Sequence, residues 1–408
     1  MSGKWPGGFI KKTAPVVVGP VDGEGGTASG IWTLDQAADY EKQGLWPKPV
    51  LPRELWMWGR NQFGQLGQGT SGATNYSSPV QVGSLTDWLK LAGSTYFGTF
   101  SVKSDGALWA WGAGAAGNLA QGNITNYSSP VQIGALTDWS ETNSGLYHTL
   151  ANKTDGTLWL WGSGAYGCLG LGNTTYYSSP KQLGALTTWV KVAGGQFASA
   201  GIPTDGTLWM WGRNNHGQLA TNNTTNYSSP VQVGALTAWL EVSTGNYFSG
   251  AVKTDGTLWM WGRNHKGQLG QGGTASTSSP VQVGVLTNWS KVKCLSNQNS
   301  HTRALKTDGT LWAWGYNGSG QLGQGNTTDY SSPVQIGALT NWLEIGGGLY
   351  SSGARTTAGT IFCWGFNNKG QLGVGDITSR SSPTQVGALT TWTRLMVSNY
   401  NAGGIKTS

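Results

Sequence analysis

Short alternating runs of apolar and polar residues fill most of the chain and predict β-strands. The runs Ala251–Lys253 and Leu258–Gly262 are typical, and the pair Asp255–Gly256 lies between them. An Asp-Gly pair in this position predicts a β-hairpin, because the turn needs positive φ at low cost. Trp259 and Trp261 are two residues apart, so both side chains lie on one face of the second strand.

Two more strand signals complete a unit of about fifty residues. A glycine-rich segment, G-x-x-x-x-G-Q-L-G, follows the hairpin and predicts a turn that holds one buried leucine. A Ser-Ser-Pro-Val-Gln-Val segment then predicts a short strand, with proline at its start where an N–H is not missed. The segment Trp239–Val242 shows the pattern of the fourth strand.

The same unit occurs seven times. The second tryptophan of the L-W-x-W-G motif recurs at spacings of 50 or 53 residues, at Trp58, Trp111, Trp161, Trp211, Trp261, Trp314 and Trp364. The S-S-P and L-T-x-W motifs recur in step with it. Four short strands per unit, repeated seven times, predict an all-β fold, a seven-bladed β-propeller of four-stranded blades.

The two ends of the repeat array predict how the ring closes. The first L-W-x-W-G motif, at Leu55, has no hairpin partner before it, whereas the last unit ends with the partner strand Gly404–Thr407. We expect this strand to lie antiparallel to Glu54–Trp58. The N- and C-terminal strands would then share one blade and remove the open edges. On this interpretation the propeller spans residues 54–408.

Residues 1–53 differ from the repeats and predict a separate, extended N-terminal arm. Thr33 and Gln36 match a capping box, which predicts one short helix over about residues 34–43 that stops at Gly44. A helix this short is marginal alone, so it is expected to dock on the propeller or on another protein. The arm's candidate anchor residues are Trp5, Phe9, Ile31, Trp32, Leu34, Tyr40 and Trp46.

Composition and charge narrow the function. The chain of 408 residues has 66 Gly and 23 Trp but only 11% charged residues, which does not fit disorder. The net charge is +7, yet the basic residues are spread thinly, so no nucleic-acid partner is expected. No signal peptide and no apolar run of about 18 residues is visible, so we expect no secretion and no membrane insertion. Three isolated cysteines favour neither a disulfide framework nor a metal site.

The sequence gives little support for catalysis. The four histidines, His148, His216, His265 and His301, lie in different units, and no Ser-His-Asp order, H-E-x-x-H or phosphate loop is present. Turn chemistry explains the repeated aspartates of the Asp-Gly pairs. We therefore expect a protein that is not an enzyme and binds no cofactor.

Two groups of residues are binding candidates on the propeller. A tyrosine precedes the S-S-P motif in five units, and these rings either stack on a glycan or pack between blades; they are Tyr76, Tyr127, Tyr177, Tyr227 and Tyr330. Unit five breaks the pattern, since Thr277 and Ser300 replace aromatic residues and an insertion lies between Trp289 and Asp308. Its residues Lys291, Lys293, His301 and Arg303 form an interface hypothesis.

The repeat resembles that of the regulator-of-chromosome-condensation family. Gly212–Leu219 and Gly262–Gly270 match its G-x-N-x-x-G-Q-L-G pattern, and the resemblance covers residues 54–408. It implies a seven-bladed propeller. The family's exchange activity on a small GTPase depends on an inserted wedge and irregular loops. Units that vary by at most three residues leave no room for that insertion, so we do not expect this activity.

The arm resembles the start of structural proteins of tailed-phage virions, in Trp5–Pro15 and Ala28–Pro47. This resemblance implies a capsid or tail decoration or fibre protein, made in the host cytoplasm and located in the virion. The arm would bind other virion proteins, with homo-oligomers in the assembly, and the propeller would bind a host-surface glycan or receptor. The alternative is a soluble interaction scaffold or a small-GTPase regulator of the same repeat family.

Overall fold

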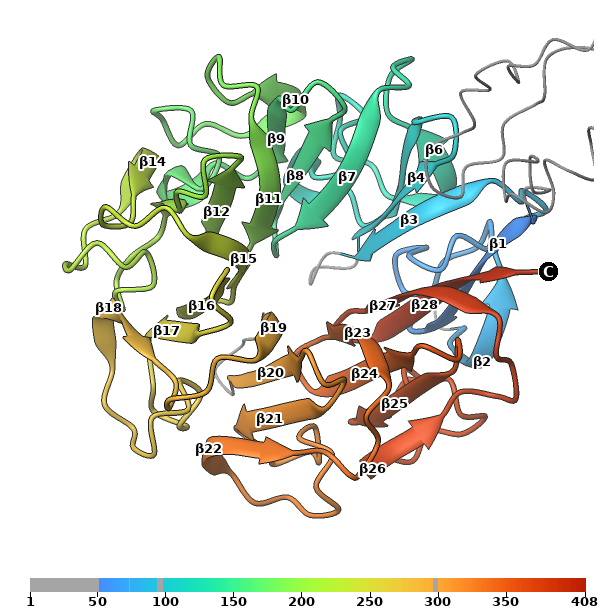
Figure 1. Ribbon diagram of the computed structural model, residues 1–408. Coiled ribbons are helices and arrows are strands. Elements are labelled where there is room, and N and C mark those ends of the chain that lie inside the picture. Colours follow the sequence, from blue (N-terminus) through green and yellow to red (C-terminus); the bar gives the residue numbers. More distant parts are fainter. Residues whose placement is uncertain (1–50, 73, 94–97, 296–299) are drawn as a thin grey trace, which may run out of the picture. The chain divides into compact units, whose positions relative to one another are not determined.

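A computed structural model describes residues 51–72, 74–93, 98–295 and 300–408. In these residues twenty-eight strands form seven four-stranded antiparallel sheets, which are arranged as blades around a centre (Figure 1). The predicted all-β, seven-bladed propeller with four strands per blade is therefore confirmed. The chain divides into two units, residues 1–52 and 53–408, and the helix predicted over residues 34–43 lies outside the described residues.

Blades 1 to 6 each consist of four consecutive strands, the first of which is innermost. Blade 1 consists of β3 (Trp88–Gly93), β4 (Gly98–Lys103), β5 (Leu108–Gly112) and β6 (Tyr127–Gln132). Blade 2 consists of β7 (Trp139–Ser144), β8 (His148–Lys153), β9 (Leu158–Gly162) and β10 (Tyr177–Gln182). Blade 3 consists of β11 (Trp189–Gly194), β12 (Ala198–Pro203), β13 (Trp209–Gly212) and β14 (Tyr227–Gln232). Blade 4 consists of β15 (Trp239–Thr244), β16 (Phe248–Lys253), β17 (Leu258–Gly262) and β18 (Thr277–Gln282). Blade 5 consists of β19 (Trp289–Leu295), β20 (His301–Lys306), β21 (Leu311–Gly315) and β22 (Tyr330–Gln335). Blade 6 consists of β23 (Trp342–Gly347), β24 (Ser351–Thr356), β25 (Ile361–Gly365) and β26 (Arg380–Gln385). Two short 3-10 turns, η1 (Ala115–Gly117) and η2 (Ala165–Gly167), follow β5 and β9.

Blade 7 is built from both ends of the propeller chain. Its strands, from the centre outward, are β27 (Trp392–Val397), β28 (Asn401–Thr407), β1 (Arg53–Gly59) and β2 (Tyr76–Gln81). Strands β1 and β28 are antiparallel, with Glu54 opposite Lys406 and Trp58 opposite Ala402. The predicted closure of the ring is confirmed, and the closing sheet begins at Arg53.

Turn chemistry explains why each Asp-Gly pair forms a hairpin. In blade 4, Gly256 has φ 77°, a conformation that a residue with a side chain rarely adopts. The Asp255 carboxylate accepts a hydrogen bond from the Thr257 N–H at 2.9 Å and another from the Thr257 hydroxyl. That hydroxyl in turn accepts the indole N–H of Trp259 at 2.8 Å. The turn thereby fixes where the next strand starts.

Tryptophans join each blade to the blade before it. The second tryptophan of the L-W-x-W-G motif is completely buried in every unit. Its indole N–H donates to a backbone carbonyl in the Gly-x-Leu turn of the preceding blade, as from Trp314 to Gln268 at 2.9 Å and from Trp58 to Gln371 at 3.1 Å. Since the bond from Trp58 crosses the junction of the termini, the ring is closed by the same contact that links every other pair of blades.

The propeller has two different ends. The end that we call the turn end carries the Asp-Gly hairpins and the Leu-Thr-x-Trp connections, and Arg53 lies there, bonded to Thr86. The opposite end, which we call the mouth end, carries the loops between first and second strands and those between third and fourth strands. The blades therefore present similar short turns at one end and longer loops at the other. Within the described residues, no helix is long and apolar enough to span a membrane.

Candidate binding face at the mouth end

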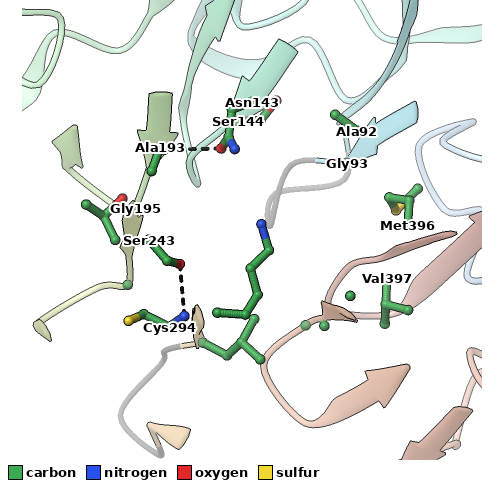
Figure 2. A pocket seen from close by; sticks show the side chains of 18 of the residues that line it. Ala92, Gly93, Asn143, Ser144, Ala193, Gly195, Ser243, Cys294, Met396 and Val397 are labelled. Atoms are coloured by element: carbon green, nitrogen blue, oxygen red, sulfur yellow. Dashed lines mark hydrogen bonds between the residues drawn. The ribbon is translucent and has the colours of Figure 1, made fainter. Parts of the chain in front are cut away.

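A cavity of about 500 Å³, which we call the channel cavity, lies among the innermost strands. Its lining includes Asn143, Ser243 and Cys294 from three of these strands, and Tyr147 and Gln196 from mouth-end loops. Figure 2 shows that its labelled side chains are small or of medium size and come from several blades. The cavity thus has a largely polar lining and extends from the inner strands to the mouth end.

Hydrogen bonds tie the wall of the channel cavity from blade to blade. The Asn143 side chain accepts the backbone N–H of Gly194 at 3.2 Å, and the Ser243 hydroxyl accepts the N–H of Cys294 at 2.9 Å (Figure 2). These polar atoms are therefore used to hold the wall together. The described residues contain no cluster of three or more His, Cys, Asp or Glu side chains that could hold a metal ion.

One Ser–His contact occurs, but its geometry is not that of a nucleophile and its base. His148 Nε2 lies 2.8 Å from the Ser199 hydroxyl, which donates its own proton to the Cys168 carbonyl at 2.7 Å. The histidine must therefore donate to the serine, and burial lowers the pKa of His148 to about 4. Both side chains are completely buried, so they stabilise the contact between blades 2 and 3 and are closed to a substrate.

Beside the channel cavity, aromatic and basic side chains from blades 2 to 5 form a continuous surface. We call it the Arg–aromatic belt, and it consists of Tyr147, Tyr166, Phe197, Arg213, His216, Tyr247, Arg263, Lys266 and Tyr316. Phe197 stacks on Tyr147 with ring centroids 5.4 Å apart and meets the edge of Tyr166 at 5.2 Å. Tyr147 also lines the channel cavity, so the belt and the cavity are contiguous.

Two arginines of the belt share one tyrosine. The Arg213 guanidinium lies 4.9 Å from the ring centre of Tyr166 and 5.4 Å from that of Tyr247. Arg263 lies 5.3 Å from the same Tyr247 ring, and His216 meets that ring edge-on at 4.9 Å. Lys266 lies 5.4 Å from the Tyr316 ring and forms the belt's ion pair with Asp329, at 3.4 Å. The aromatic rings hold these cations in fixed positions.

The two ends of the propeller differ in charge. Carboxylates at the turn end, one or more in most blades, are Asp87, Asp105, Asp138, Asp155, Asp205, Asp255 and Asp308. In the described part of the mouth-end loops the carboxylates are Asp329 and Asp376, and both are paired, with Lys266 and Arg380. The pKa of His216 is lowered, first by partial burial and then by the nearby charges of Arg263, Arg213 and His265. The belt is therefore a site of uncompensated positive charge.

The structure separates the residues of the unit-five hypothesis. Lys291 is exposed and donates to the Leu343 carbonyl at 2.9 Å, and Lys293 lines the channel cavity. His301 and Arg303 are completely buried in β20, the second strand of blade 5, so neither reaches the surface. Residues 296–299 of the insertion lie outside the described residues. Thr277 belongs to blade 4, because the sequence unit and the blade are offset by two strands.

The five predicted tyrosines lie at the periphery of the mouth end. Their rings are half-buried and pack against the core clusters between blades. In four of them the hydroxyl accepts a hydrogen bond from an asparagine, as in the pair Asn223 and Tyr227 at 2.9 Å. Glycan stacking by these rings stays a prediction. The anchor residues predicted in the arm, from Trp5 to Trp46, all lie outside the described residues.

The sequence interpretation did not include the belt. Two signals were available: arginine follows the Trp-Gly pair in three units, at Arg60, Arg213 and Arg263, and an aromatic residue stands where the related family commonly has histidine. Both positions lie in loops whose neighbours come from other blades. Only the arrangement of the blades brings Arg213 against Tyr166 and Tyr247.

Comparisons with known protein families identify the fold family. The model of the RCC1-like domain matches residues 52–349, and the regulator of chromosome condensation (RCC1) repeat matches residues 358–398. The chain belongs to the RCC1-like domain family. The matched region begins at residue 52, next to Arg53, where the first strand of the propeller begins.

Solved structures of low sequence identity share this fold. Human WBSCR16 superposes with a TM-score of 0.77 at 20% identity, over 87% of this chain and 99% of that one. Prp20p from Saccharomyces cerevisiae, which has been examined for its binding to Gsp1p and histones, superposes with a TM-score of 0.76 at 17% identity, over 88% and 92%. These similarities concern the fold alone.

Two curated relatives match short segments. The ultraviolet-B receptor UVR8 of Arabidopsis thaliana is 47% identical over 47 residues, which are 12% of this chain and 11% of the receptor. The human E3 ubiquitin-protein ligase HERC2 is 35% identical over 89 residues, which are 21% of this chain and 2% of the ligase. The chain thus matches only a small part of the length of either relative.

Proposed function

We propose that this RCC1-like propeller is a protein-binding module without catalytic activity, and that its partner docks at the mouth end. The family membership supports a role in protein interaction, since a member of the same fold, Prp20p, binds Gsp1p and histones. Fold alone does not decide function, so the proposal rests on the surface itself.

The Arg–aromatic belt is the observation that carries this proposal. Tyrosine and arginine are enriched at the energetic centres of protein interfaces, where rigid side chains bury area at a small entropic cost. In the belt, Arg213 and Tyr247 are held by ring contacts before any partner arrives. Tyr166, with 43% of its surface exposed, offers apolar area directly beside them. Such preorganisation favours tight binding because less side-chain freedom is lost.

The expected lack of catalysis fits the same surface. The Ser–His pair is buried, and its serine hydroxyl donates its proton to a backbone carbonyl. The charged residues in the lining of the channel cavity are Glu141, Lys293 and Glu344. The Glu344 carboxylate accepts the Arg355 Nε–H at 2.9 Å and the Leu395 N–H at 3.1 Å. These two hydrogen bonds use the Glu344 carboxylate to hold the wall of the cavity together.

A bulky group attached to one end at a time tests the docking face. The native cysteines are buried, and burial raises the pKa of Cys168 and of Cys363 to about 12, so maleimides should spare them. Asn215→Cys at the mouth end and Ala185→Cys at the turn end are exposed positions for a polyethylene glycol maleimide.

Each labelled propeller is used as bait in an extract of the cells in which the protein occurs, and captured proteins are identified. A partner retained by unlabelled protein and by labelled Ala185→Cys, but lost on labelled Asn215→Cys, supports the proposal. A partner lost only on labelled Ala185→Cys overturns it, because the turn end would then be the docking face.

The virion role stays a prediction that rests on the arm. The family matches begin at residue 52, so they concern the propeller and not residues 1–51. Removal of residues 1–50 should leave a folded propeller that no longer joins its assembly, as measured by co-purification with phage particles. Incorporation of the truncated protein at the level of the intact protein would contradict arm-mediated attachment.

A further inference from the structure

Two guanidinium groups of the Arg–aromatic belt lie at one ring, and neither has a carboxylate partner. Arg213 and Arg263 both lie within 5.4 Å of the ring centre of Tyr247. In the residues that the structure describes, no ion pair involves either arginine, and Arg213 Nε is buried without a hydrogen-bond partner. Two unneutralised charges at one ring repel each other, so a ligand with negative charge is favoured there.

The charges of the two arginines act on the groups around them. His216 lies against the same Tyr247 ring, and its lowered pKa has the charges of Arg263 and Arg213 among its causes after partial burial. At neutral pH the imidazole is therefore uncharged and can accept or donate a hydrogen bond. Lys266, in the loop of Arg263, has an anionic partner, Asp329, and shows the type of group that the arginines lack.

The geometry of the arginines points to carboxylates. A ring contact covers the flat face of a guanidinium and leaves its N–H edge for a ligand in the same plane. A carboxylate matches that edge with two parallel hydrogen bonds. Arg213 lies within cation–π distance of both Tyr166 and Tyr247 and its Nε is buried, so a carboxylate would bind the two terminal N–H groups of its guanidinium.

The aromatic rings of the belt favour a protein over a glycan or a nucleic acid. Sugars and bases bind by stacking on an open ring face. Here Phe197 stacks on Tyr147, and the Tyr247 ring has both arginines as cation–π partners. The rings thus largely contact one another and cations. The surface that they leave for a partner consists of apolar ring edges beside positive charge. A peptide that alternates acidic and apolar side chains fits this arrangement.

We propose that the Arg–aromatic belt binds an acidic segment of a protein partner, with carboxylates on Arg213 and Arg263 and an apolar side chain beside Tyr166 and Phe197. This inference rests on the proposed function and adds the chemistry of the partner to it. The same residues make binding sensitive to salt, because ionic contacts at a surface weaken as ionic strength rises.

Fluorescence anisotropy with a labelled Glu- and Leu-rich peptide tests the chemistry on the full chain. A Lys- and Leu-rich peptide of equal length and labelled heparin serve as comparison probes. Arg213→Gln and Arg263→Gln should each weaken binding of the acidic peptide about tenfold, since each removes a charge-assisted contact. Arg60→Gln is the matched control: it removes the same charge from the same motif position, where Arg60 lies 5.3 Å from the Tyr400 ring in blade 7.

The expected result is binding of the acidic peptide that both belt variants weaken and that Arg60→Gln changes by less than about twofold. Equal losses in all three variants would overturn the proposal, because they would show an effect of net charge alone. Binding of heparin but not of the acidic peptide would overturn it, because the ligand would then be a sulfated glycan. Binding of the basic peptide would overturn it, because the surface would then favour positive charge.

If the acidic peptide does not bind while labelled Asn215→Cys still loses the partner, the proposed chemistry of the partner is wrong and docking at the mouth end stands. If the peptide binds as expected while only labelled Ala185→Cys loses the partner, the belt binds acidic peptides but is not the docking face.

Discussion

The turn end and the mouth end of this propeller are built from the same seven units but differ in how much the units vary. At the turn end, nearly every blade repeats one Asp-Gly hairpin and one Leu-Thr-x-Trp connection, whose leucines are 42–51% exposed in all seven blades. At the mouth end the loops differ in their side chains and, in some units, in length, and the belt occupies only blades 2 to 5. The repeated residues of the turn end thus report on the fold, whereas the belt combines a repeated aromatic position with side chains that change from unit to unit.

The largest expected effect comes from breaking the ring at the turn end. Deletion of Gly403–Ser408 removes most of β28, a strand that pairs with both β1 and β27, and leaves Arg53–Met57 of β1, with the buried Leu55 and Met57, on an unpaired edge. Loss of one buried leucine or methionine side chain costs about 2–5 kcal/mol, against about 5–15 kcal/mol for a whole domain. We expect aggregation or a large fall in Tm by calorimetry.

A circular permutant is the control for this deletion. It joins Ser408 to Arg53 through a short glycine linker and opens the chain at Asp205–Gly206, so it moves the break to another turn-end hairpin. If the turn-end positions are equivalent, the permutant folds. A truncated protein that melts like the intact one would show that the shared blade does not hold the ring closed.

The two ends should also lose stability in different ranges of pH. At the mouth end, burial lowers the pKa of His148 to about 4 and that of His301 well below its usual value. As the pH falls, the unfolded chain binds protons at these histidines before the folded protein does. The stability that is present above pH 6.5 is therefore lost as the pH falls toward 4. His148 contributes a loss of about 2 kcal/mol by pH 5, and His301 adds a loss of the same sign. Urea unfolding at several pH values measures this slope.

The turn-end carboxylates act at lower pH. Hydrogen bonds from threonine lower the pKa of Asp155 and Asp255 below the ordinary value, so their contribution is present above about pH 4 and is lost below it. In His148→Phe/His301→Phe, the slope between pH 6.5 and 5 should shrink to the contribution of the remaining histidines, among them His216 with its lowered pKa, and the acid loss should remain. Phe248 occupies the equivalent buried position of blade 4. A double variant with the slope of the parent would contradict this assignment.

A pair of tryptophans in one blade compares the two ends at smaller scale. Trp314, towards the mouth end, donates its indole N–H to the Gln268 carbonyl, whereas Trp289, at the turn end, is buried with its N–H unpartnered. Trp314→Phe should therefore cost about 1 kcal/mol more unfolding free energy than Trp289→Phe, the value of one hydrogen bond. Trp261 and Trp239 form the same pair in blade 4. Equal costs in both pairs would show that the inter-blade bond adds no stability.

The smallest effect is expected from a conservative change of one turn. Asn at position 255 keeps an oxygen that accepts the Thr257 N–H, so Asp255→Asn should shift Tm by less than about 2 °C. It should also leave binding of the acidic peptide unchanged, because the turn lies at the opposite end from the belt. A loss of peptide binding in Asp255→Asn would show that the two ends are not independent.

The fold could be predicted from the sequence because its signals are local and repeated. The Asp-Gly pair fixes each hairpin, and the position of Leu55 relative to Gly404–Thr407 fixes the closure. The candidate site could not be predicted in this way. Arg213 meets Tyr166 and Tyr247 only because three blades come together, and His301 and Arg303 are buried because β20 is the second strand of its sheet, covered by blades on both faces.

The footprint of a captured partner on the propeller, measured by hydrogen exchange, tests the central claim most directly. The belt should mark the site, so the account predicts slower exchange in the mouth-end loops 163–167, 195–197, 213–217 and 245–247. The turn-end hairpins, such as residues 203–207, should exchange as in the free protein. Protection at the turn-end hairpins with unchanged mouth-end loops would contradict the claim.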